Sequence, residues 1–355
     1  MKVAIISDSH FGARGDSQVF MEYFKKFYEE VFFPTLQERG IDTIIHMGDV
    51  VDRRKYINWK TTFQMREMFF DACSDRGIKL PLILGNHDVF FRNTLKVNAL
   101  DGLRLSDNEN FTVYEEPTEI ELDGNKFFLQ PWICDENREQ SLKAIKETTA
   151  QVLFGHLEVK GFEMYAGQYS QSGVNENIFK KFDMAMSGHF HHKSDNGTVF
   201  YLGNPYEITW SDYKDPRGFH IFDTETRTLE FIQNPYRMFR KFYYDDSKET
   251  FESITEKDYS EYSNAYVKVI IQNKTNPFWF DTVLDKLYAV DVANLVVVEN
   301  YLDLEFMEED EIIDEAQDTL TILSKYVNSL NMNNKTELNT LMRDLYNEAL
   351  MVGTL

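Results

Sequence analysis

Aspartate, asparagine and histidine recur in five short clusters within the first 191 residues of this 355-residue sequence. The clusters are Asp8-Ser-His10, Gly48-Asp49-Val-Val-Asp52, Gly85-Asn86-His87-Asp88, Gly155-His156 and Gly188-His189-Phe-His191, and they hold five of the eight histidines. Carboxylate, amide and imidazole groups suit Mn²⁺, Fe²⁺ or Zn²⁺, and the absence of cysteine from the set argues against a structural thiolate site. The pattern predicts a dinuclear metal site.

Each cluster follows a short apolar run that reads as a β-strand. These runs are residues 3–7, 43–47, 80–84, 152–154 and 184–187. Runs that are apolar throughout are typical of strands covered on both faces. Ligands far apart in the sequence can meet only where the fold brings them to one rim, and the ends of neighbouring strands do this. We therefore expect the clusters to converge at strand ends.

The ligand types indicate how two ions would be held. Asp49 can bridge both ions; the side chains expected around the first are Asp8, His10 and His191, and those around the second are Asn86, His156 and His189. Two metal ions about 3.5–4 Å apart bind a phosphate, generate a hydroxide for in-line attack and stabilise the developing charge. His87 follows Asn86 in a turn, so it should point differently and can donate a hydrogen bond or a proton to the leaving oxygen.

The individual clusters differ in how specific they are. A lone Gly-His pair is usually a turn, whereas Gly-Asn-His-Asp after a strand is rare, so the prediction depends on five clusters in order. Of the other histidines, His46 lies inside a predicted strand and is expected to be packed or to support a ligand. His192 and His220 have no special spacing and are expected to be structural.

The predicted elements divide the chain into three parts, of which residues 1–235 form the largest. This part alternates strands with helices, and the helices are expected at about residues 19–39, 60–76 and 136–147. Successive antiparallel strands are expected at residues 112–114, 119–122 and 126–130, and further short strands at residues 199–202, 219–222 and 229–232. We predict an α/β (α+β) fold with two mixed β-sheets packed face to face and flanked by helices.

The remaining two parts lack the ligand residues. Residues 236–303 read as a small α+β domain with strands near residues 240–244, 266–271 and 295–298 and a helix over residues 279–289. We expect this domain to shape the substrate site. Residues 304–355 predict two helices, each with one apolar stripe. Such helices either fold back on the body of the protein or dock on a partner helix, and docking is favoured.

Composition limits the possible partners. The formal net charge is −22, and acidic residues concentrate at residues 245–261 and 305–318. This charge argues against sequence-independent coating of nucleic acid by the chain alone, although bound cations can invert the charge of a small cleft. No apolar run approaches the ~18 residues that span a bilayer, so no membrane contact is expected. Cys73 and Cys134 form no CxxC pair, which fits a reducing cytoplasm without structural disulfides.

The ordered clusters resemble the motifs of the calcineurin-like metallophosphoesterase superfamily. Within it, Asp8-Ser-His10-Phe-Gly12 is similar to the opening motif of the SbcD-type DNA double-strand-break repair nucleases. Three later segments resemble elements of such nucleases, including the recombination endonuclease subunits of T4-like phages; they are Gln130-Pro-Trp-Ile-Cys-Asp135, Tyr201-Leu-Gly-Asn-Pro-Tyr206 and Asp215-Pro-Arg-Gly-Phe219. Specific motifs cover residues 1–235, and beyond them the resemblance rests on the order of the domains.

The resemblance implies a metallophosphoesterase sandwich and a Mn²⁺-dependent nuclease, with exonuclease action on duplex DNA ends and endonuclease action on single strands. It implies two Mn²⁺ ions, with Mg²⁺ or Fe²⁺ as alternatives, held by the seven expected ligands, and it makes His87 the transition-state histidine. The implied partners are single- and double-stranded DNA and an SbcC-like ABC ATPase whose coiled coil binds the C-terminal helices. A homodimer through residues 57–70 and 93–103 is also implied.

Asp52 departs from the family pattern. Many cellular members have histidine at the position where this chain has Asp52. A carboxylate at that position can orient His87, so Asp52 is counted with the catalytic residues.

A Ser/Thr phosphoprotein phosphatase is the main alternative, because Gly48-Asp-Val-Val-Asp-Arg53 also resembles a phosphatase motif in which the arginine grips phosphate. Against this, Arg54 stands where glycine is usual, the third cluster ends in Asp88 instead of glutamate, and about 120 C-terminal residues are extra. A non-catalytic scaffold is disfavoured because no expected ligand is missing. The nuclease is the favoured hypothesis.

Basic side chains in loops near the clusters are candidates for contacts to DNA phosphates. They are Arg14, Arg53, Arg54, Lys55, Lys193 and Arg217. Three aromatic side chains can stack unpaired bases or pack in the core; they are Tyr206, Trp210 and Tyr213. Because of the net charge, we expect the isolated chain to bind DNA weakly and to bind it tightly only with the ATPase.

Overall fold

The computed structural model describes residues 1–165, 168–299, 327, 335 and 338–342. The chain divides into two compact units, residues 1–301 and residues 302–355. In the second unit the described residues are helical, and the two predicted C-terminal helices otherwise lie outside the described residues. Among the helices that the structure describes, none is long and apolar enough to cross a membrane.

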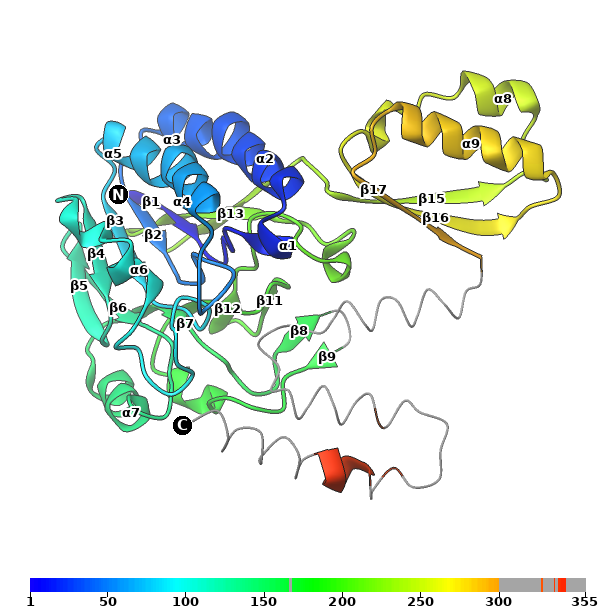
Figure 1. Ribbon diagram of the computed structural model, residues 1–355. Coiled ribbons are helices and arrows are strands. Elements are labelled where there is room, and N and C mark those ends of the chain that lie inside the picture. Colours follow the sequence, from blue (N-terminus) through cyan, green and yellow to red (C-terminus); the bar gives the residue numbers. More distant parts are fainter. Residues whose placement is uncertain (166–167, 300–326, 328–334, 336–337, 343–355) are drawn as a thin grey trace. The chain divides into compact units, whose positions relative to one another are not determined.

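Two six-stranded mixed sheets form the body of the first unit (Figure 1). The first has the order β14-β13-β1-β2-β3-β4, with β14 at Leu229–Gln233, β13 at Gly218–Asp223, β1 at Lys2–Ile6, β2 at Ile44–His46, β3 at Leu80–Ile83 and β4 at Phe111–Tyr114. The second has the order β11-β12-β10-β7-β6-β5, with β11 at Ser194–Asp195, β12 at Val199–Tyr201, β10 at Met184–Gly188, β7 at Val152–His156, β6 at Asn125–Gln130 and β5 at Thr118–Leu122.

Each sheet contains four adjacent parallel strands. In the first sheet these are β1 to β4, and β13 pairs antiparallel with both β1 and β14. In the second sheet they are β12, β10, β7 and β6, with β11 and β5 antiparallel at the two edges. The carboxyl ends of four neighbouring strands therefore lie along one edge of each sheet.

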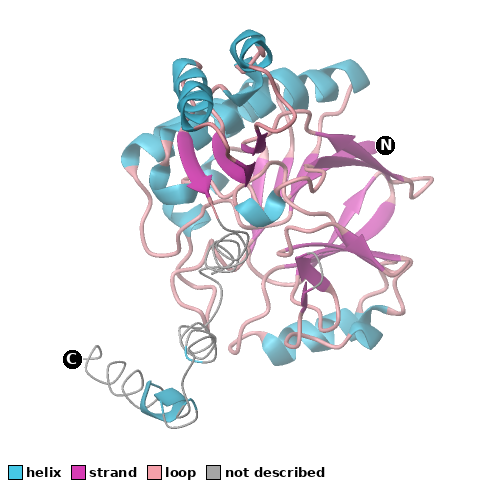
Figure 2. Ribbon diagram, turned by 90° about the vertical axis from the view of Figure 1, so that its right-hand side faces the viewer, coloured by secondary structure: helices cyan, strands magenta, loops and turns pink. Residues whose placement is uncertain are grey.

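Alternation of side chains along the strands directs the two faces of each sheet into different apolar cores. Val3 and Ile5 of β1 pack between the sheets against residues such as Phe127 and Phe154 of the second sheet. Ala4 and Ile6, on the other face of β1, pack against the helices outside the first sheet. Figure 2 shows strands between helices on the two outer sides. The predicted pair of mixed sheets flanked by helices is confirmed.

The helices of this body lie on the two outer faces. One long helical segment covers the first sheet through α2 (Gln18–Phe27), a π-helical turn η1 (Tyr28–Phe32) and α3 (Phe33–Arg39). A second runs through α4 (Trp59–Met65), the π-helical η2 (Arg66–Asp71) and α5 (Ala72–Asp75). The second sheet is covered by α7 (Arg138–Glu147) and the 3₁₀ turn η4 (Glu176–Phe179). Shorter elements are α1 (Ala13–Asp16), α6 (Ala99–Gly102), η3 (Leu105–Asp107), β8 (Glu163–Tyr165), β9 (Gln168–Tyr169) and η5 (Trp210–Asp212).

One strand assignment from the sequence was wrong. Residues 112–114 were expected to begin a run of antiparallel strands with residues 119–122 and 126–130. Instead, β4 pairs parallel with β3 in the first sheet, and only β5 and β6 form an antiparallel hairpin, in the second sheet. The short turn between β4 and β5 therefore passes from one sheet to the other, which periodicity within each strand does not reveal.

A small α/β layer follows the sandwich, and we call residues 239–298 the cap domain. Its strands β15 (Phe239–Asp245), β16 (Tyr266–Asn273) and β17 (Asn294–Val298) are parallel. Helices α8 (Phe251–Glu256) and α9 (Pro277–Ala289) cover one face (Figure 1), and the 3₁₀ turn η6 (Ser260–Tyr262) precedes β16. Helix α9 begins two residues before the predicted start because Asn276 caps it by accepting from the amides of Phe278 and Trp279.

Candidate metal centre

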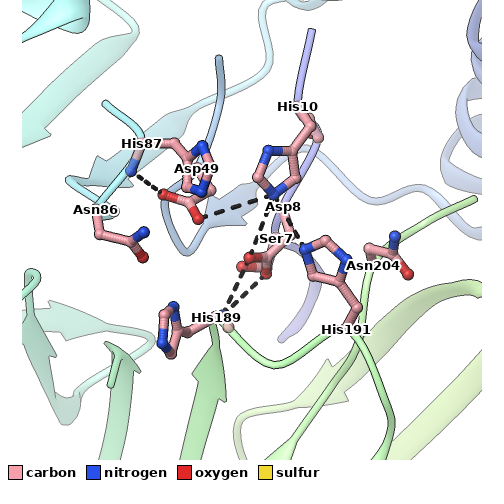
Figure 3. Close-up of polar contacts among 12 residues, drawn as sticks. Ser7, Asp8, His10, Asp49, Asn86, His87, His189, His191 and Asn204 are labelled. Carbon is pink, nitrogen blue, oxygen red and sulfur yellow. Dashed lines mark hydrogen bonds and ion pairs between the residues drawn. The ribbon is translucent and has the colours of Figure 1, made fainter. Parts of the chain in front are cut away.

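The five clusters meet where the carboxyl edges of the two sheets come together. Asp8, Asp49 and Asn86 follow β1, β2 and β3 of the first sheet, while His156 ends β7 and His189 follows β10 of the second sheet. Figure 3 shows side chains from these clusters turned toward one another. The backbone amide of His189 donates to both carboxylate oxygens of Asp8 at 3.1 Å, which joins the two sheets at the site.

Four of these residues have a left-handed backbone. The φ angles are 54° for Asp8, 42° for His10, 52° for Asp49 and 87° for His189. For residues other than glycine this conformation costs about 1–3 kcal/mol and persists only where surrounding contacts impose it, most often at functional sites. The turns after β1, β2 and β10 are thus strained, and their strained backbones direct the side chains toward the same centre.

Asp88 holds two of the turns together, a role that the sequence did not indicate. Its fully buried carboxylate accepts from the amides of Asp49, Val50 and Gly85 at 2.8 Å each. Burial raises the pKa of Asp88 to about 6, with the charge of Asp49 adding to the effect and the amides opposing it. The feature of the sequence that could have indicated this role is the position of Asp88 at the end of Gly-Asn-His-Asp.

The nitrogen and oxygen atoms of the described residues gather into three overlapping groups that could hold a metal ion, two made only of expected ligands and a third made of His10, Asp49 and His87. Atoms of Asp8, His10 and His191 lie within 4.8 Å of one another, as do atoms of Asp49, His156 and His189. The Nε2 atoms of His10 and His191 face each other at 3.1 Å. Two neutral imidazole nitrogens cannot both present lone pairs at that distance without a proton or a cation between them.

Asn86 and Asp49 connect the second group to the first. The Asn86 Oδ1 atom lies 3.0 Å from His156 Nε2, and Asp49 Oδ2 lies 3.3 Å from the same nitrogen. Asp49 Oδ2 also lies 3.8 Å from His10 Nε2, so this carboxylate faces both groups. The structure thus brings all seven expected ligands together, with Asp49 between the two sets, and the donor types fit two divalent cations.

Hydrogen bonds on the outer ring nitrogens leave the inner ones available to a metal. His156 Nδ1 lies 2.8 Å from the Met47 carbonyl oxygen, and His87 Nδ1 lies 2.5 Å from the Asp52 carbonyl oxygen. A carbonyl can only accept, so each Nδ1 carries a proton and Nε2 is the ring nitrogen left to act in the centre. Such outer partners fix the tautomer and orientation of a metal-binding histidine.

Electrostatics also favour cations in the centre. Burial alone lowers the pKa of His10, but the Asp52 carboxylate, 3.5 Å from its Nδ1 atom, and the charge of Asp49 raise that pKa to about 10. Burial likewise opposes the charge of His156, whose pKa Asp49 raises to about 9. The carboxylates thus draw positive charge into a buried space, and metal ions can supply that charge in place of protons.

Asp52 differs from the expectation. Its carboxylate faces His10, with Oδ1 3.5 Å from His10 Nδ1, whereas it was expected to orient His87. The contact to His87 is made by the Asp52 backbone carbonyl instead. Any residue at position 52 supplies that carbonyl, so the specific contribution of aspartate is its support of His10.

The basic candidates for DNA contact fall into two groups. Arg14 and Lys55 are exposed, and the charge of Arg54 adds to burial and to His156 in holding the pKa of His189 well below its usual value. Arg53 is instead committed to the Asp16 carboxylate and the Tyr56 hydroxyl, and Lys193 is half-buried over the Phe231 ring.

Arg217 was wrongly placed among the surface cations. It is 3% exposed, and it pairs with the carboxylates of Asp212 and Asp215 at 2.8 and 2.9 Å. A guanidinium buried between two carboxylates cannot reach a DNA phosphate. Its position in a loop sequence suggested exposure, but the loop folds inward.

The aromatic candidates mostly belong to the core. Tyr206 is fully buried, stacks on Phe24 at 3.8 Å and donates from its hydroxyl to the Ser9 carbonyl at 2.6 Å. Trp210 is also buried, and Tyr213 is partly exposed. Base stacking by Tyr206 and Trp210 is therefore ruled out. Trp132, in the segment Gln130–Asp135 that carried part of the resemblance, lies against the ring of His189 with 4.9 Å between centroids.

The three remaining histidines lie outside the metal groups. His46 is buried, and its Nε2 lies 2.9 Å from the Ser9 hydroxyl, within the turn that carries Asp8 and His10. Burial lowers its pKa, and that of His220, to about 3. His192 is part-exposed and contacts Asp215 through Nδ1 at 2.8 Å.

Gly188 is expected to be intolerant of substitution. An added Cβ would overlap the Ser7 hydroxyl and lie 2.7 Å from an Asp8 carboxylate oxygen. Overpacking of this kind costs about 1–3 kcal/mol. We expect Gly188→Ala to lower the melting temperature and to weaken Mn²⁺ binding measured by calorimetric titration. Gly102→Ala is the control, because its Cβ would meet no atom within 4 Å. Unchanged metal affinity in Gly188→Ala would contradict the packing described for this turn.

With strained strand-end turns, two groups of ligands and a shared carboxylate between two mixed sheets, the site and fold define a metallophosphoesterase. Residues 1–193 match the calcineurin-like phosphoesterase family, and the chain belongs to that family. It is 33% identical over 335 residues to exonuclease subunit 1 of Enterobacteria phage T4, covering 93% of each chain. It is 23% identical over 315 residues to the SbcD component of the nuclease SbcCD of Staphylococcus epidermidis, covering 79% of this chain and 78% of that one.

A solved archaeal phosphodiesterase aligns with 66% of this chain and 100% of its own, at 16% identity and a TM-score of 0.34. The resemblance to SbcD-type proteins that the motifs indicated is confirmed by the sequence relatives. The chain is a metal-dependent phosphoesterase, and its centre contains groups of side chains that could hold metal ions.

Proposed function

We propose that this chain is the nuclease subunit of an SbcCD-like recombination and repair complex, and that it hydrolyses DNA phosphodiesters with two Mn²⁺ ions. It acts as an exonuclease on duplex ends and as an endonuclease on single strands. The observation that carries the proposal is the convergence of the candidate metal-binding groups on a chain that aligns over 93% of its length with a protein named as an exonuclease subunit. The names of the relatives, an exonuclease subunit and a nuclease subunit, support a nucleic acid as the substrate.

The proposed ligands divide between two ions that share Asp49. Asp8, His10 and His191 would hold one ion, and Asn86, His156 and His189 would hold the other. Their mixture of oxygen and imidazole donors without thiolate suits Mn²⁺ and also admits Mg²⁺ or Fe²⁺. When bound, such ions lower the pKa of an attacking water and neutralise charge on the phosphate.

His87 is proposed to act on the leaving oxygen. Its ring lies edge-on to His10 with 4.7 Å between centroids, and Nδ1 is tied to the Asp52 carbonyl. Nε2 is therefore the atom that faces the centre and can hold a proton for the departing alkoxide. Asp52 keeps the neighbouring His10 in place through its carboxylate.

The contacts of Arg53 weigh against a phosphoprotein phosphatase. In that alternative the arginine after the second cluster grips the substrate phosphate. Here the Arg53 guanidinium donates to the Asp16 carboxylate and, at 2.8 Å, to the Tyr56 hydroxyl. A phosphate would have to displace a carboxylate from this arginine, which supports a different use of the site.

Product analysis with Mn²⁺ tests the proposed substrate. The purified chain is incubated with end-labelled duplex DNA, with a labelled single strand and, separately, with a phosphopeptide. We expect nucleotides from the duplex ends, internal cuts in the single strand and no inorganic phosphate from the peptide. Phosphate release from the peptide with intact DNA would support the phosphatase instead. Chelation of the metal should stop all cleavage.

The partner proposal concerns the rest of the chain. Residues 236–303, which include the cap domain, are proposed to form a domain that contacts DNA. Residues 304–355 are proposed to bind the coiled coil of an SbcC-like ATPase. Net charge of −22 supports weak DNA binding by this subunit alone. The two buried, free cysteines are compatible with action in the reducing cytoplasm.

A homodimer is proposed through residues 57–70 and 93–103. Helix α4 in this surface exposes Trp59 and Phe63, with 79% and 72% of each accessible. The Arg66 guanidinium donates to the Leu103 carbonyl at 3.4 Å, so the two segments adjoin each other. Exposed aromatic side chains gathered on one face mark interaction surfaces.

We expect the double substitution Trp59→Glu, Phe63→Glu to convert the dimer to a monomer, because buried aromatic anchors contribute about 2 kcal/mol or more each to an interface. Sedimentation equilibrium measures the change. Tyr288→Glu is the control, since Tyr288 is another exposed aromatic residue, on α9 of the cap domain. A wild-type chain that stays monomeric at high concentration, or a double variant that stays dimeric, would remove the proposed interface.

A further inference from the structure

Arg217 is buried directly behind the metal centre and contacts the backbone of a proposed ligand. Its Nη1 atom donates to the His191 carbonyl and, at 2.5 Å, to Asn204 Oδ1. Its Nη2 atom donates to Asp212 Oδ1 at 2.8 Å and to Asp215 Oδ2 at 2.9 Å. Figure 3 shows Asn204 beside His191. One guanidinium therefore ties the loop that carries His191 to two other loops.

The His191 loop is enclosed on more than one side. At Gly203, whose φ is +71°, an added Cβ would lie 2.7 Å from the His191 carbonyl oxygen. The imidazole of His191 points the other way, with Nε2 3.1 Å from His10 Nε2. The carbonyl is thus directed into the guanidinium while the ring is directed into the centre. Moving the carbonyl would move the ring.

The turn that holds Arg217 also contacts the cap domain. Asp212 closes η5, and its second carboxylate oxygen accepts from the amides of Ile208 and Thr209 at 2.7 and 2.9 Å. Trp210 in the same turn packs against Phe239 of β15, with 4.7 Å between ring centroids. The ammonium group of Lys268, in β16, lies 4.2 Å from the Trp210 ring centroid. The turn therefore has Arg217 on one side and two cap strands on the other.

Arg217 could in principle serve only to neutralise two carboxylates in the interior. That role requires a positive charge but no particular shape. The geometry goes further, because the planar guanidinium donates to four acceptors on three loops, and one of these acceptors is the backbone carbonyl of a proposed ligand. Lysine would keep the charge but could not reproduce this planar fork of donors. The two roles therefore predict different results for the same substitution.

We propose that Arg217 is a positioning residue for His191 and that, through η5, it couples the ion at His191 to the seating of the cap domain. The inference rests on the proposed ligand set and does not depend on which phosphodiester is hydrolysed. Coupling between two sites is reciprocal. An ion bound at His191 should therefore reduce the mobility of η5 and the adjoining cap strand. Loss of the Arg217 contacts should in turn lower the affinity for that ion.

Calorimetric titration of Arg217→Lys with Mn²⁺ tests the positioning role without measuring cleavage. We expect one of the two ions to bind about 10–100-fold more weakly, the usual cost of losing an outer partner of a ligand, and the other to bind as before. Arg39→Lys is the matched control, because Arg39 pairs with the Glu230 carboxylate of the edge strand β14 at 2.5 Å and makes no contact with the acceptors of Arg217. Two ions of unchanged affinity in a folded Arg217→Lys would overturn the proposal.

Hydrogen exchange in the unmodified chain tests the coupling and needs no variant of Arg217. Adding Mn²⁺ should slow exchange at residues 208–213 and 239–245. The same addition to His191→Ala should leave the rate of exchange in these segments unchanged. Exchange that does not respond to Mn²⁺ in the wild type would overturn the coupling. Failure of the wild type to bind a second ion would refute the ligand set itself and the inference with it, and failure to cleave DNA would refute only the proposed substrate.

Discussion

Replacing Asp49 by alanine is expected to abolish both metal binding and DNA cleavage. Its carboxylate lies 3.3 Å from His156 Nε2 and 3.8 Å from His10 Nε2, so it is the group that faces both sets of ligands. Its Oδ1 atom also accepts from the His87 amide at 2.7 Å, so the substitution loosens the turn that carries Asn86 and His87. The loss should exceed the roughly 10–100-fold reduction in metal affinity that follows loss of an outer partner.

Metal analysis after dialysis against Mn²⁺ and a nuclease assay on the same preparation measure the effect of Asp49→Ala. Asp42→Ala is the control, because Asp42 is an exposed aspartate just before β2, whereas Asp49 follows that strand. A melting curve establishes that each variant is folded. Retention of two ions by Asp49→Ala would show that Asp49 does not bridge them.

Replacing His87 by alanine should give the opposite combination, with both ions retained and cleavage reduced about 10²–10⁴-fold, the usual contribution of a positioned acid or base. The reason is that His87 directs Nδ1 to the Asp52 carbonyl and presents only Nε2 to the centre. His87 also lies within 4.8 Å of ligand atoms of His10 and Asp49, so a ligand role has to be tested against the catalytic one.

The metal content of His87→Ala decides between these roles. Loss of an ion would make His87 a ligand, whereas full occupancy with little cleavage supports proton donation. His220→Ala controls for the loss of a buried imidazole, since His220 packs on Phe231 with 5.1 Å between ring centroids, away from both metal groups. Near-normal cleavage by His87→Ala would remove His87 from the mechanism.

Much of the centre could be predicted because its ligands are encoded locally. Asp8, Asp49, Asn86, His156 and His189 each come at or just after a strand, and parallel strands deliver their carboxyl ends to one edge. The continuous apolar character of residues 3–7 also indicated a sheet buried on both faces, as the packing of Val3 and Ala4 on opposite sides demonstrates. These features depend on short segments and on the geometry of a sheet.

The residues that were misjudged depend on contacts between distant segments. Arg217 reads as a surface cation until Asp212, Asp215 and the His191 carbonyl close around it. The Asp52 carboxylate turns toward His10 because the turn after β2 places its carbonyl, and not its side chain, against His87. Likewise, the change of sheet between β4 and β5 leaves no trace in the alternation of either strand. Side-chain direction in strained turns is therefore the part that sequence could not supply.

Titration of Mn²⁺ into the metal-free chain, with bound ions and nucleotide release from labelled duplex DNA followed in the same samples, would decide whether this is a two-metal DNA nuclease. We expect two ions per chain and cleavage that rises only as the second ion binds. Full cleavage with one ion per chain, or two bound ions without any release of nucleotides, would contradict that mechanism.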